Sequence, residues 1–247
     1  MSHVPYGMQR GLRNSSAEAD TTAGEIIRHC TRPGVMALTF DDGPSRYTSH
    51  LLDLLRAHGA KATFFINGNN YASPLDGQDT PWPDLLHRMH ASGHQLASHT
   101  WTHQNLDSAD RSLRIDQMVF NEMALRNIFG FFPTYMRPPY GECGQFSGCQ
   151  ADMASLGYHV VNWDVDTRDW AYQHDIRQAM DVFSSSVSGD AGGNSYIVLS
   201  HDVHEQTVYS LAEYMILEAK RLGYELVTVG ECLNDPAENW YDWEERW

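Results

Sequence analysis

Two neighbouring aspartates, Asp41 and Asp42, stand in the segment TFDDGP directly after the apolar run of residues 35–38. Adjacent carboxylates repel each other, so a bound cation would offset their charge and leave the second carboxylate free to act as a base. The residues alone leave open which aspartate takes which role. The competing interpretation is an ordinary turn, in which an aspartate caps the backbone and Gly43-Pro44 fixes the bend.

The segment SHTWTH places His99 and His103 four residues apart, after a predicted strand at residues 95–98. This spacing puts two imidazoles on one face if the segment turns helical. Two neutral imidazoles and one carboxylate make a three-ligand set that leaves positions open for water and substrate, as catalytic zinc sites require. The chain has 13 histidines, so the pair gains its weight from standing at a strand end, opposite the aspartates.

Three further polar segments follow predicted strands. Arg137 in RPPYG could hold the free aspartate through a bidentate pair and keep it ionised at neutral pH. His201 in LSHD could protonate a leaving group, and Asp166 in DVDTRDW could hold that histidine cationic and oriented. Taken singly, a surface arginine, a buried histidine and a helix N-cap are the commoner explanations. Together, and each at a strand end, they predict an active site.

The elements that must position these groups are short apolar runs alternating with amphipathic stretches. Helical patterns such as YTSHLLDLLRAHG and TVYSLAEYMILEAKRLG each close on a glycine, Gly59 or Gly223, in a position typical of a helix C-terminus. Strands are predicted at residues 35–39, 62–66, 95–98, 135–137, 158–163, 196–200 and 225–229.

This alternation of strands and helices predicts an α/β fold with a mostly parallel sheet. Seven strands in about 200 residues favour a distorted, seven-stranded (β/α) barrel over an open doubly wound sheet. Both architectures place the functional site at the carboxyl ends of the strands.

Composition narrows the setting. The 247 residues are 42% hydrophobic and carry a formal net charge of −15, which repels phosphate backbones and anionic lipid surfaces. No apolar run approaches the roughly 18 residues of a membrane span, and the N-terminus lacks the apolar core of a signal peptide, so we expect any targeting segment to have been removed or replaced. We expect a monomer that binds neither nucleic acid nor membrane.

The four cysteines lack the CxxC spacing of a zinc knuckle, which leaves free thiols or two disulfides. Closing a barrel would bring Cys30, before the first strand, to Cys232, after the last, while Cys143 and Cys149 could staple one loop. Asn14-Ser15-Ser16 is a glycosylation sequon. With paired cysteines, it favours a secreted glycoprotein.

In this order, the segments TFDDGP, HTWTH, RPPY, DTRDW and LSH resemble the motifs of the polysaccharide deacetylases of carbohydrate esterase family four, which include chitin, peptidoglycan and acetylxylan deacetylases. The resemblance covers about residues 35–230 and is closest to secreted fungal chitin deacetylases. We therefore expect an N-terminal extension at residues 1–30 packing on or near the barrel, a catalytic domain at 31–233 and a C-terminal tail at 234–247.

The resemblance implies metal-dependent hydrolysis of N-acetyl groups from the N-acetylglucosamine units of chitin or its oligosaccharides, releasing acetate and leaving glucosamine. Asp41 becomes the general base that activates a water, and His201 the general acid that protonates the departing amine. Asp42, His99 and His103 become the ligands of a divalent cation, zinc or alternatively Co²⁺.

Five further positions receive roles from the same resemblance. Arg137 orients the base, Asp166 pairs with the general acid, and the backbone N–H of Tyr140 donates to the oxyanion. Trp170 and Leu199 line a small pocket for the acetyl methyl group.

Other functions remain as alternatives. Peptidoglycan or acetylxylan could replace chitin as substrate. A non-haem iron oxygenase also uses two histidines and a carboxylate, but has no use for a second aspartate held by arginine. A carbohydrate-binding pseudo-enzyme would keep the aromatic residues and lose catalytic groups. Aromatic residues in predicted loops, Tyr71, Trp82, Trp101 and Tyr172, could stack on sugar rings.

Overall fold

The computed structural model describes residues 23–69, 73–77, 79–189 and 191–243. The sequon at Asn14 and the aromatic ring of Tyr71 lie outside these residues. Within the described part of the chain, no helix combines the length and the apolar character needed to cross a membrane.

A nine-stranded sheet forms the centre of the molecule, in the order β1-β7-β6-β4-β3-β2-β9-β8, with β10 pairing beside β2. All of its pairings are parallel. The strands are β1 Ile26–Ile27, β2 Val35–Asp41, β3 Thr63–Ile66, β4 Gln95–Ser98, β6 Tyr135–Met136, β7 His159–Val161, β8 Val165–Asp166, β9 Tyr196–His201 and β10 Glu225–Leu226. Each predicted strand is present, and the short β1 and β8 are additional.

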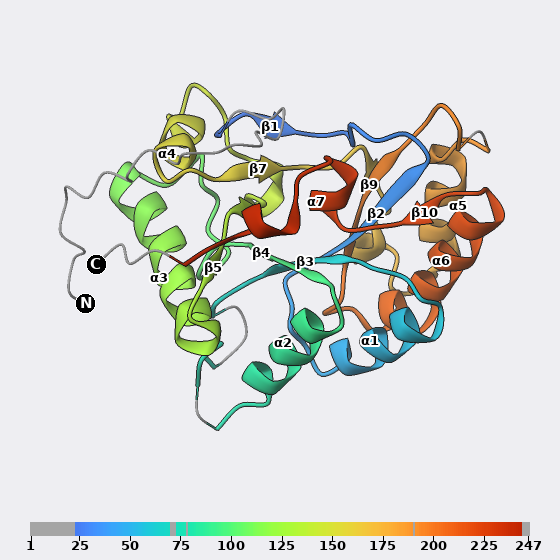
Figure 1. Ribbon diagram of the computed structural model, residues 1–247, viewed down its shortest axis with the longest axis horizontal. Coiled ribbons are helices and arrows are strands. Elements are labelled where there is room, and N and C mark those ends of the chain that lie inside the picture. The colour runs from blue at the N-terminus through green and yellow to red at the C-terminus, as the bar shows by residue number, and fades with distance from the viewer. Residues whose placement is uncertain (1–22, 70–72, 78, 190, 244–247) are drawn as a thin grey trace.

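Helices surround this sheet, with α3 and α4 on one side, α1 and α2 below and α5 and α6 on the other side in Figure 1. Their bounds are α1 Thr48–Ala57, α2 Trp82–Ala91, α3 Arg111–Phe129, α4 Cys149–Ser155, α5 Arg177–Ser186, α6 Ala212–Arg221 and α7 Val229–Cys232. Shorter elements are the helical turns η1 Pro139–Gly141, η2 Asp169–Ala171, η3 Thr207–Leu211 and η4 Ala237–Asn239, and the antiparallel strand pair β5 Phe132–Pro133 and β11 Tyr241–Asp242. The arrangement confirms the distorted α/β barrel, in the form of a curled half-barrel.

Strand β2 is buried along its whole length, which explains why its sequence is an apolar run rather than an alternating pattern. Met36, Leu38 and Phe40 pack into the core cluster that includes residues of α1 and α6. Val35 and Ala37 pack with side chains from the other strands and from α7, in the interior of the barrel. Burial on both faces holds the end of β2 at a fixed position, with Asp41 as its last residue and Asp42 directly after it.

The sheet is not closed by strand pairing, since no pairing among the described residues joins β1 to β8. Side chains connect the two regions instead. His29 Nδ1 lies 3.1 Å from Asp164 Oδ2, and Asp164 Oδ1 accepts a 2.7 Å hydrogen bond from the N–H of Ile197 in β9. Residues 23–30, within the predicted N-terminal extension, supply β1.

Both predicted disulfides are present. Cys30 and Cys232 join the segment after β1 to the end of α7, and Cys143 and Cys149 close a short loop before α4. The described residues contain no free cysteine. The first bridge ties together the two ends of the barrel sequence, as its order along the chain predicted.

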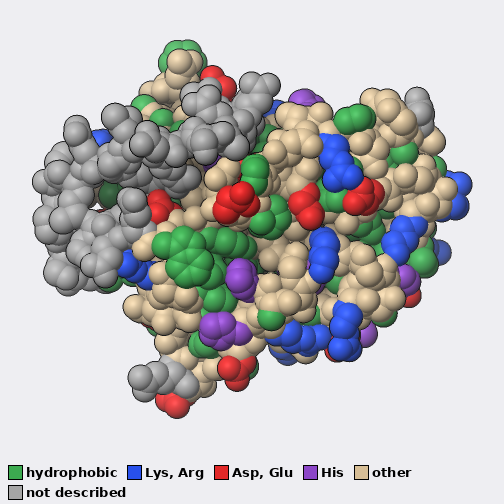
Figure 2. All heavy atoms as spheres, viewed as in Figure 1, with side chains coloured by type: hydrophobic (Ala, Val, Ile, Leu, Met, Phe, Trp, Pro, Cys, Tyr) green, Lys and Arg blue, Asp and Glu red, His purple; other side chains and the backbone are tan. Residues whose placement is uncertain are grey.

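Figure 2 shows hydrophobic side chains gathered beside histidines on the face that carries α2, α3 and α7. Where α2, α3 and β11 meet, Phe131 packs against Phe129, Tyr241 and Trp243, with ring centroids 4.5–4.9 Å apart. His90 of α2 lies beside the same rings. This cluster fixes the C-terminal segment against the helices.

Candidate active site

The polar groups predicted at strand ends meet at one edge of the sheet because the strands that carry them are neighbours. In the order β6-β4-β3-β2-β9, Asp41 ends β2 beside His201, which ends β9. Ser98, the last residue of β4, pairs with Met136 of β6, and their chains continue directly into His99 and Arg137. Parallel pairing therefore brings four motifs to one place.

Asp42, His99 and His103 form a cluster whose candidate ligand atoms all lie within 4.8 Å of one another. Asp42 Oδ1 is 3.4 Å from His99 Nε2 and 3.3 Å from His103 Nε2, and this buried oxygen has no hydrogen-bond partner among the described residues. The histidine segment is not helical, contrary to one way of explaining the spacing: Thr100 (φ 71°) and His103 (φ 56°) adopt left-handed conformations that fold the chain back.

The donor set fits a divalent cation. His99 Nδ1 lies 2.8 Å from the carbonyl oxygen of Arg137, which can only accept, so Nδ1 carries the proton and Nε2 presents a lone pair toward Asp42. Burial and the neighbouring His99 lower the pKa of His103 and favour the neutral imidazole that metal binding needs. Ligands about 2.0–2.2 Å from a tetrahedral zinc lie about 3.3–3.6 Å apart, close to the observed oxygen–nitrogen distances.

Asp41 is held by Arg137, a fully buried guanidinium. Arg137 Nη1 donates to Asp41 Oδ1 and to the hydroxyl of Thr39, each at 2.7 Å. The predicted bidentate pair is wrong, because Nη2 and Nε donate to the backbone carbonyls of Asn162 and Val161 instead. These carbonyls fix the plane of the guanidinium, so Asp41 receives one oriented donor and keeps Oδ2 free of Arg137.

His201 is paired with Asp169, not with Asp166 as the sequence analysis predicted. His201 Nδ1 lies 2.8 Å from Asp169 Oδ1, and the His201 N–H donates to Asp169 Oδ2 at 2.7 Å. Burial alone would lower the pKa of His201, but the carboxylate of Asp169, with further contributions from Asp41 and Asp42, raises it to about 9. Asp166 Oδ1 instead accepts the backbone N–H of Arg168.

The remaining predicted residues surround this cluster. Tyr140 has a left-handed backbone (φ 63°), and no other described residue accepts a hydrogen bond from its N–H. Its exposed ring lies 4.9 Å from that of His103. Leu199 is buried in β9 next to Asp166 of β8, and the exposed Trp170 follows directly on Asp169.

A comparison with known families matches residues 28–161 to polysaccharide deacetylase. The chain is 46% identical over 235 residues to a chitin deacetylase of Colletotrichum lindemuthianum, covering 94% of this chain and 93% of that protein. The chain belongs to the polysaccharide deacetylase family.

Solved structures agree with this family assignment. The structure of the chitin deacetylase from Colletotrichum lindemuthianum superimposes with a TM-score of 0.87 at 46% identity, covering 91% of this chain and 98% of that one. A chitin deacetylase of Pestalotiopsis sp is 44% identical over 91% of this chain and 72% of its own length. A peptidoglycan N-acetylglucosamine deacetylase structure, Bc1960, has a TM-score of 0.72 at 25% identity, covering 87% and 94%.

Asp202, which was not among the residues predicted from the sequence, supports the turn at Asp42 and Gly43 in this polysaccharide deacetylase. Its buried carboxylate accepts the hydroxyl of Thr48 and lies against Gly43, where a Cβ would come within 2.3 Å of Asp202 Oδ1. The backbone carbonyl of Asp202 accepts the Ser45 hydroxyl at 2.7 Å. Burial, and the negative charge of Asp42, raise the pKa of Asp202 to about 7 although Thr48 opposes this.

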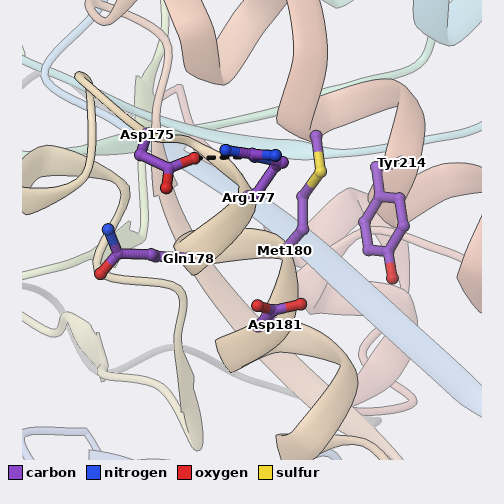
Figure 3. A pocket seen from close by; sticks show the side chains of 6 residues that line it. All are labelled: Asp175, Arg177, Gln178, Met180, Asp181 and Tyr214. Carbon is purple, nitrogen blue, oxygen red and sulfur yellow. Dashed lines mark hydrogen bonds and ion pairs between the residues drawn. The ribbon is translucent and has the colours of Figure 1, made fainter.

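A hollow of about 330 Å³ lies between α5 and α6 (Figure 3). It is lined by Asp175, Arg177, Gln178, Met180, Asp181 and Tyr214. Asp175 and Arg177 form a solvent-exposed ion pair with a 3.0 Å separation. Exposed pairs of this kind contribute little energy, and the hollow contains none of the deacetylase motif residues.

Proposed function

We propose that this protein hydrolyses N-acetyl groups of chitin or chitin oligosaccharides and releases acetate. The observation that carries the proposal is the pairing of opposite proton-transfer groups beside one candidate cation site. Asp41, fixed by Arg137, suits a base, and His201, kept cationic by Asp169, suits an acid. Sequence identity of 44–46% with chitin deacetylases, over more than 90% of this chain, supports chitin as the substrate.

Asp42, His99 and His103 would hold the cation, which we propose to be zinc. When bound, the cation would polarise the acetyl carbonyl and lower the pKa of a water molecule beside Asp41. Asp41 then takes the proton of the attacking water. Arg137 holds the carboxylate in orientation, and Thr39, which shares the same Nη1, limits the rotation of that guanidinium.

His201 donates a proton to the nitrogen as the carbon–nitrogen bond breaks, so acetate and a free amine leave the site. Asp169 makes this transfer possible by orienting the Nδ1 side of the ring and leaving Nε2 to face the substrate. The backbone N–H of Tyr140 is the proposed donor to the oxyanion that forms at the acetyl carbonyl oxygen. Leu199 and Trp170 are proposed to enclose the methyl group.

The two disulfides and the fungal relatives support a secreted protein. Relatives named as peptidoglycan N-acetylglucosamine deacetylases, one of them as probable, include proteins 41% identical over 88% and 36% identical over 81% of this chain, so peptidoglycan is the competing substrate. The test is acetate release from acetylated chitin oligosaccharides, peptidoglycan and acetylxylan, with and without a chelator. We expect chelator-sensitive release that is fastest from chitin oligosaccharides, and faster release from peptidoglycan would reassign the substrate.

The two aspartates are separated by a pair of isosteric variants. Asp41→Asn cannot accept a proton, so metal content stays and turnover falls by about 10² to 10⁴. Asp42→Asn removes a ligand charge, so metal affinity falls and added zinc restores part of the activity. Elemental analysis and turnover at saturating zinc are measured together. Loss of metal in Asp41→Asn, with full metal in Asp42→Asn, would exchange the two roles.

A further inference from the structure

The loop between Cys143 and Cys149 presents one fully exposed aromatic ring. Phe146 stands midway along this loop, and its side chain is exposed to solvent over its entire surface. Large apolar side chains in such surroundings lose the free energy that burial would provide, about 1.5–3 kcal/mol for a phenylalanine. The two cysteines stand only six residues apart in the sequence, and the short loop that they close leaves the ring uncovered.

The loop is held in place by more than its disulfide. Asp107 Oδ1 accepts both the N–H of Gly144 and the hydroxyl of Ser147, each at 2.6 Å. At the base of the loop, Asn105 donates to the Glu142 carboxylate. Phe146 therefore stands on a braced support, and a partner of its ring would not have to order the loop on binding.

This support is continuous with the candidate active site. The loop begins at Cys143, two residues after Gly141, and Asp107, which braces it, follows His103 by four residues. The ring of Tyr140 lies 4.9 Å from that of His103. Six residues of chain span at most about 20 Å, so Phe146 lies within a few sugar units of the candidate metal ligands.

Exposed aromatic rings recur at this end of the barrel. Tyr140 and Trp170 are both exposed and both follow strands that end at the site, β6 and β8. Sugar rings have apolar faces of C–H groups, and flat aromatic rings pack against them with little loss of side-chain freedom. Of the loop aromatics selected from the sequence, Trp82 begins α2, and Trp101 packs over Gly68, so neither matches Phe146 in exposure.

We infer that Phe146 is a stacking platform for an N-acetylglucosamine unit of the bound chain, away from the unit that loses its acetyl group. The inference rests on the proposed function and adds a determinant of chain-length preference to it. A ring that contacts a distant sugar strengthens binding of the substrate and the transition state alike. Its removal should therefore raise KM more than it lowers kcat, and only chains long enough to reach the ring should gain from it.

The test compares wild type, Phe146→Ala and Phe146→Trp on the dimer, tetramer and hexamer of β-linked N-acetylglucosamine. Because Phe146 is fully exposed, Phe146→Ala should fold as the wild type does. We expect KM for the hexamer to rise about three- to tenfold in Phe146→Ala, with the rise growing from dimer to hexamer. Phe146→Trp should restore the wild-type KM. Leu217→Ala, an exposed apolar position on α6, is the matched control and should behave as wild type.

Calorimetric titration of the same oligosaccharides separates this inference from the proposed function. If no acetate is released but longer oligosaccharides bind more tightly and Phe146→Ala weakens that binding, the proposed function is wrong and the role of Phe146 stands. Equal Kd and KM in Phe146→Ala and wild type at every length would overturn the platform. An equal loss of affinity for the dimer and the hexamer would also overturn it. So would a change only in the sedimentation coefficient of Phe146→Ala, which would mean that the ring contacts a second copy of the protein.

Discussion

Replacing Asp169 by asparagine should move the alkaline limit of activity, because this carboxylate is the main group that raises the pKa of His201. Asparagine has nearly the same shape, and its side-chain oxygen can still accept the His201 Nδ1–H. The His201 ring therefore keeps its partner while the negative charge disappears, although the NH2 group that replaces Oδ2 can no longer accept the His201 backbone N–H. Asp169 is buried, and the imidazole of His201 keeps the pKa of Asp169 below its ordinary value, so the charge is present at every pH of interest.

The magnitude follows from the two pKa values of His201. The pKa is about 9 in the protein and 6.5 for an ordinary histidine, a difference that corresponds to about 3 kcal/mol in favour of the imidazolium. A general acid must carry its proton, so activity is complete below the pKa and falls as pH rises through it. If the pKa falls to 6.5 or below, toward the value that burial alone would give, turnover at pH 8 should fall by about 30-fold or more, and the loss at pH 6 should be much smaller.

The assay is the pH profile of turnover at saturating zinc, with Asp166→Asn as the matched control. Asp166 lies in the same motif but is hydrogen-bonded to Arg168, so its replacement should leave the alkaline limit near its wild-type position. A bound cation acts on all three proteins alike, which makes the difference between profiles the decisive quantity. An alkaline limit that moves in Asp166→Asn and stays in Asp169→Asn would refute the pairing of His201 with Asp169.

Two further substitutions test the candidate ligand His103 and the buried carboxyl group of Asp202. His103→Ala should remove most bound zinc in elemental analysis while His87→Ala on α2 retains it, and full occupancy in His103→Ala would place the ligands elsewhere. Asp202 keeps its proton in the folded protein up to about pH 7 but loses it near pH 4 in the unfolded chain. The contribution of Asp202 to wild-type stability should therefore decrease as pH rises from 4 to 7. With chelator present, Asp202→Asn should escape this fall and unfold at a higher temperature than wild type at pH 8 but not at pH 4; equal pH dependence of the two proteins contradicts the buried neutral carboxyl.

Much of the fold was predictable because burial and connectivity leave a plain record in the sequence. Parallel strands buried on both faces read as short apolar runs, and Val35–Asp41 shows this at full length. The rule that sites lie at the carboxyl ends of such strands then selected Asp41, His99 and His201 without knowledge of strand order. The strands Ile26–Ile27 and Val165–Asp166 were missed, whereas Tyr135–Met136 and Glu225–Leu226, which are just as short, were predicted.

The choice between Asp166 and Asp169 depends on backbone geometry that the sequence does not record. Both lie in DTRDW, and either carboxylate could reach a histidine on the next strand. Asp166 still belongs to β8, whereas Arg168 takes a left-handed conformation (φ 55°) and turns the chain so that Asp169 points under His201. In the sequence, Asp169 differs from Asp166 in standing directly before a tryptophan. In the structure this tryptophan is exposed, and Asp169 begins a helical turn.

A local turn of the same kind explains how Asp41, the last residue of β2, and Asp42, directly after it, both face His99. Successive side chains in a strand point to opposite faces, so a regular strand could not aim Asp41 and Asp42 at one target. Asp42 instead adopts φ 73°, a conformation that costs a non-glycine residue about 1–2 kcal/mol. With it, Asp41 Oδ2 and Asp42 Oδ1 come within 3.8 and 3.4 Å of the same nitrogen, His99 Nε2.

That strained turn requires support, and the residues around it supply it. Gly43 leaves room for the Asp202 carboxylate, and a β-carbon there would overlap it. Asp202 in turn binds Thr48, at the start of α1, and follows the general-acid candidate His201 in the chain. A glycine in TFDDGP and an aspartate in LSHD thus act together on the position of Asp42. The spacing of the two aspartates is therefore explained by a turn after all, but by one that aims both carboxylates at a single imidazole rather than one that caps the backbone.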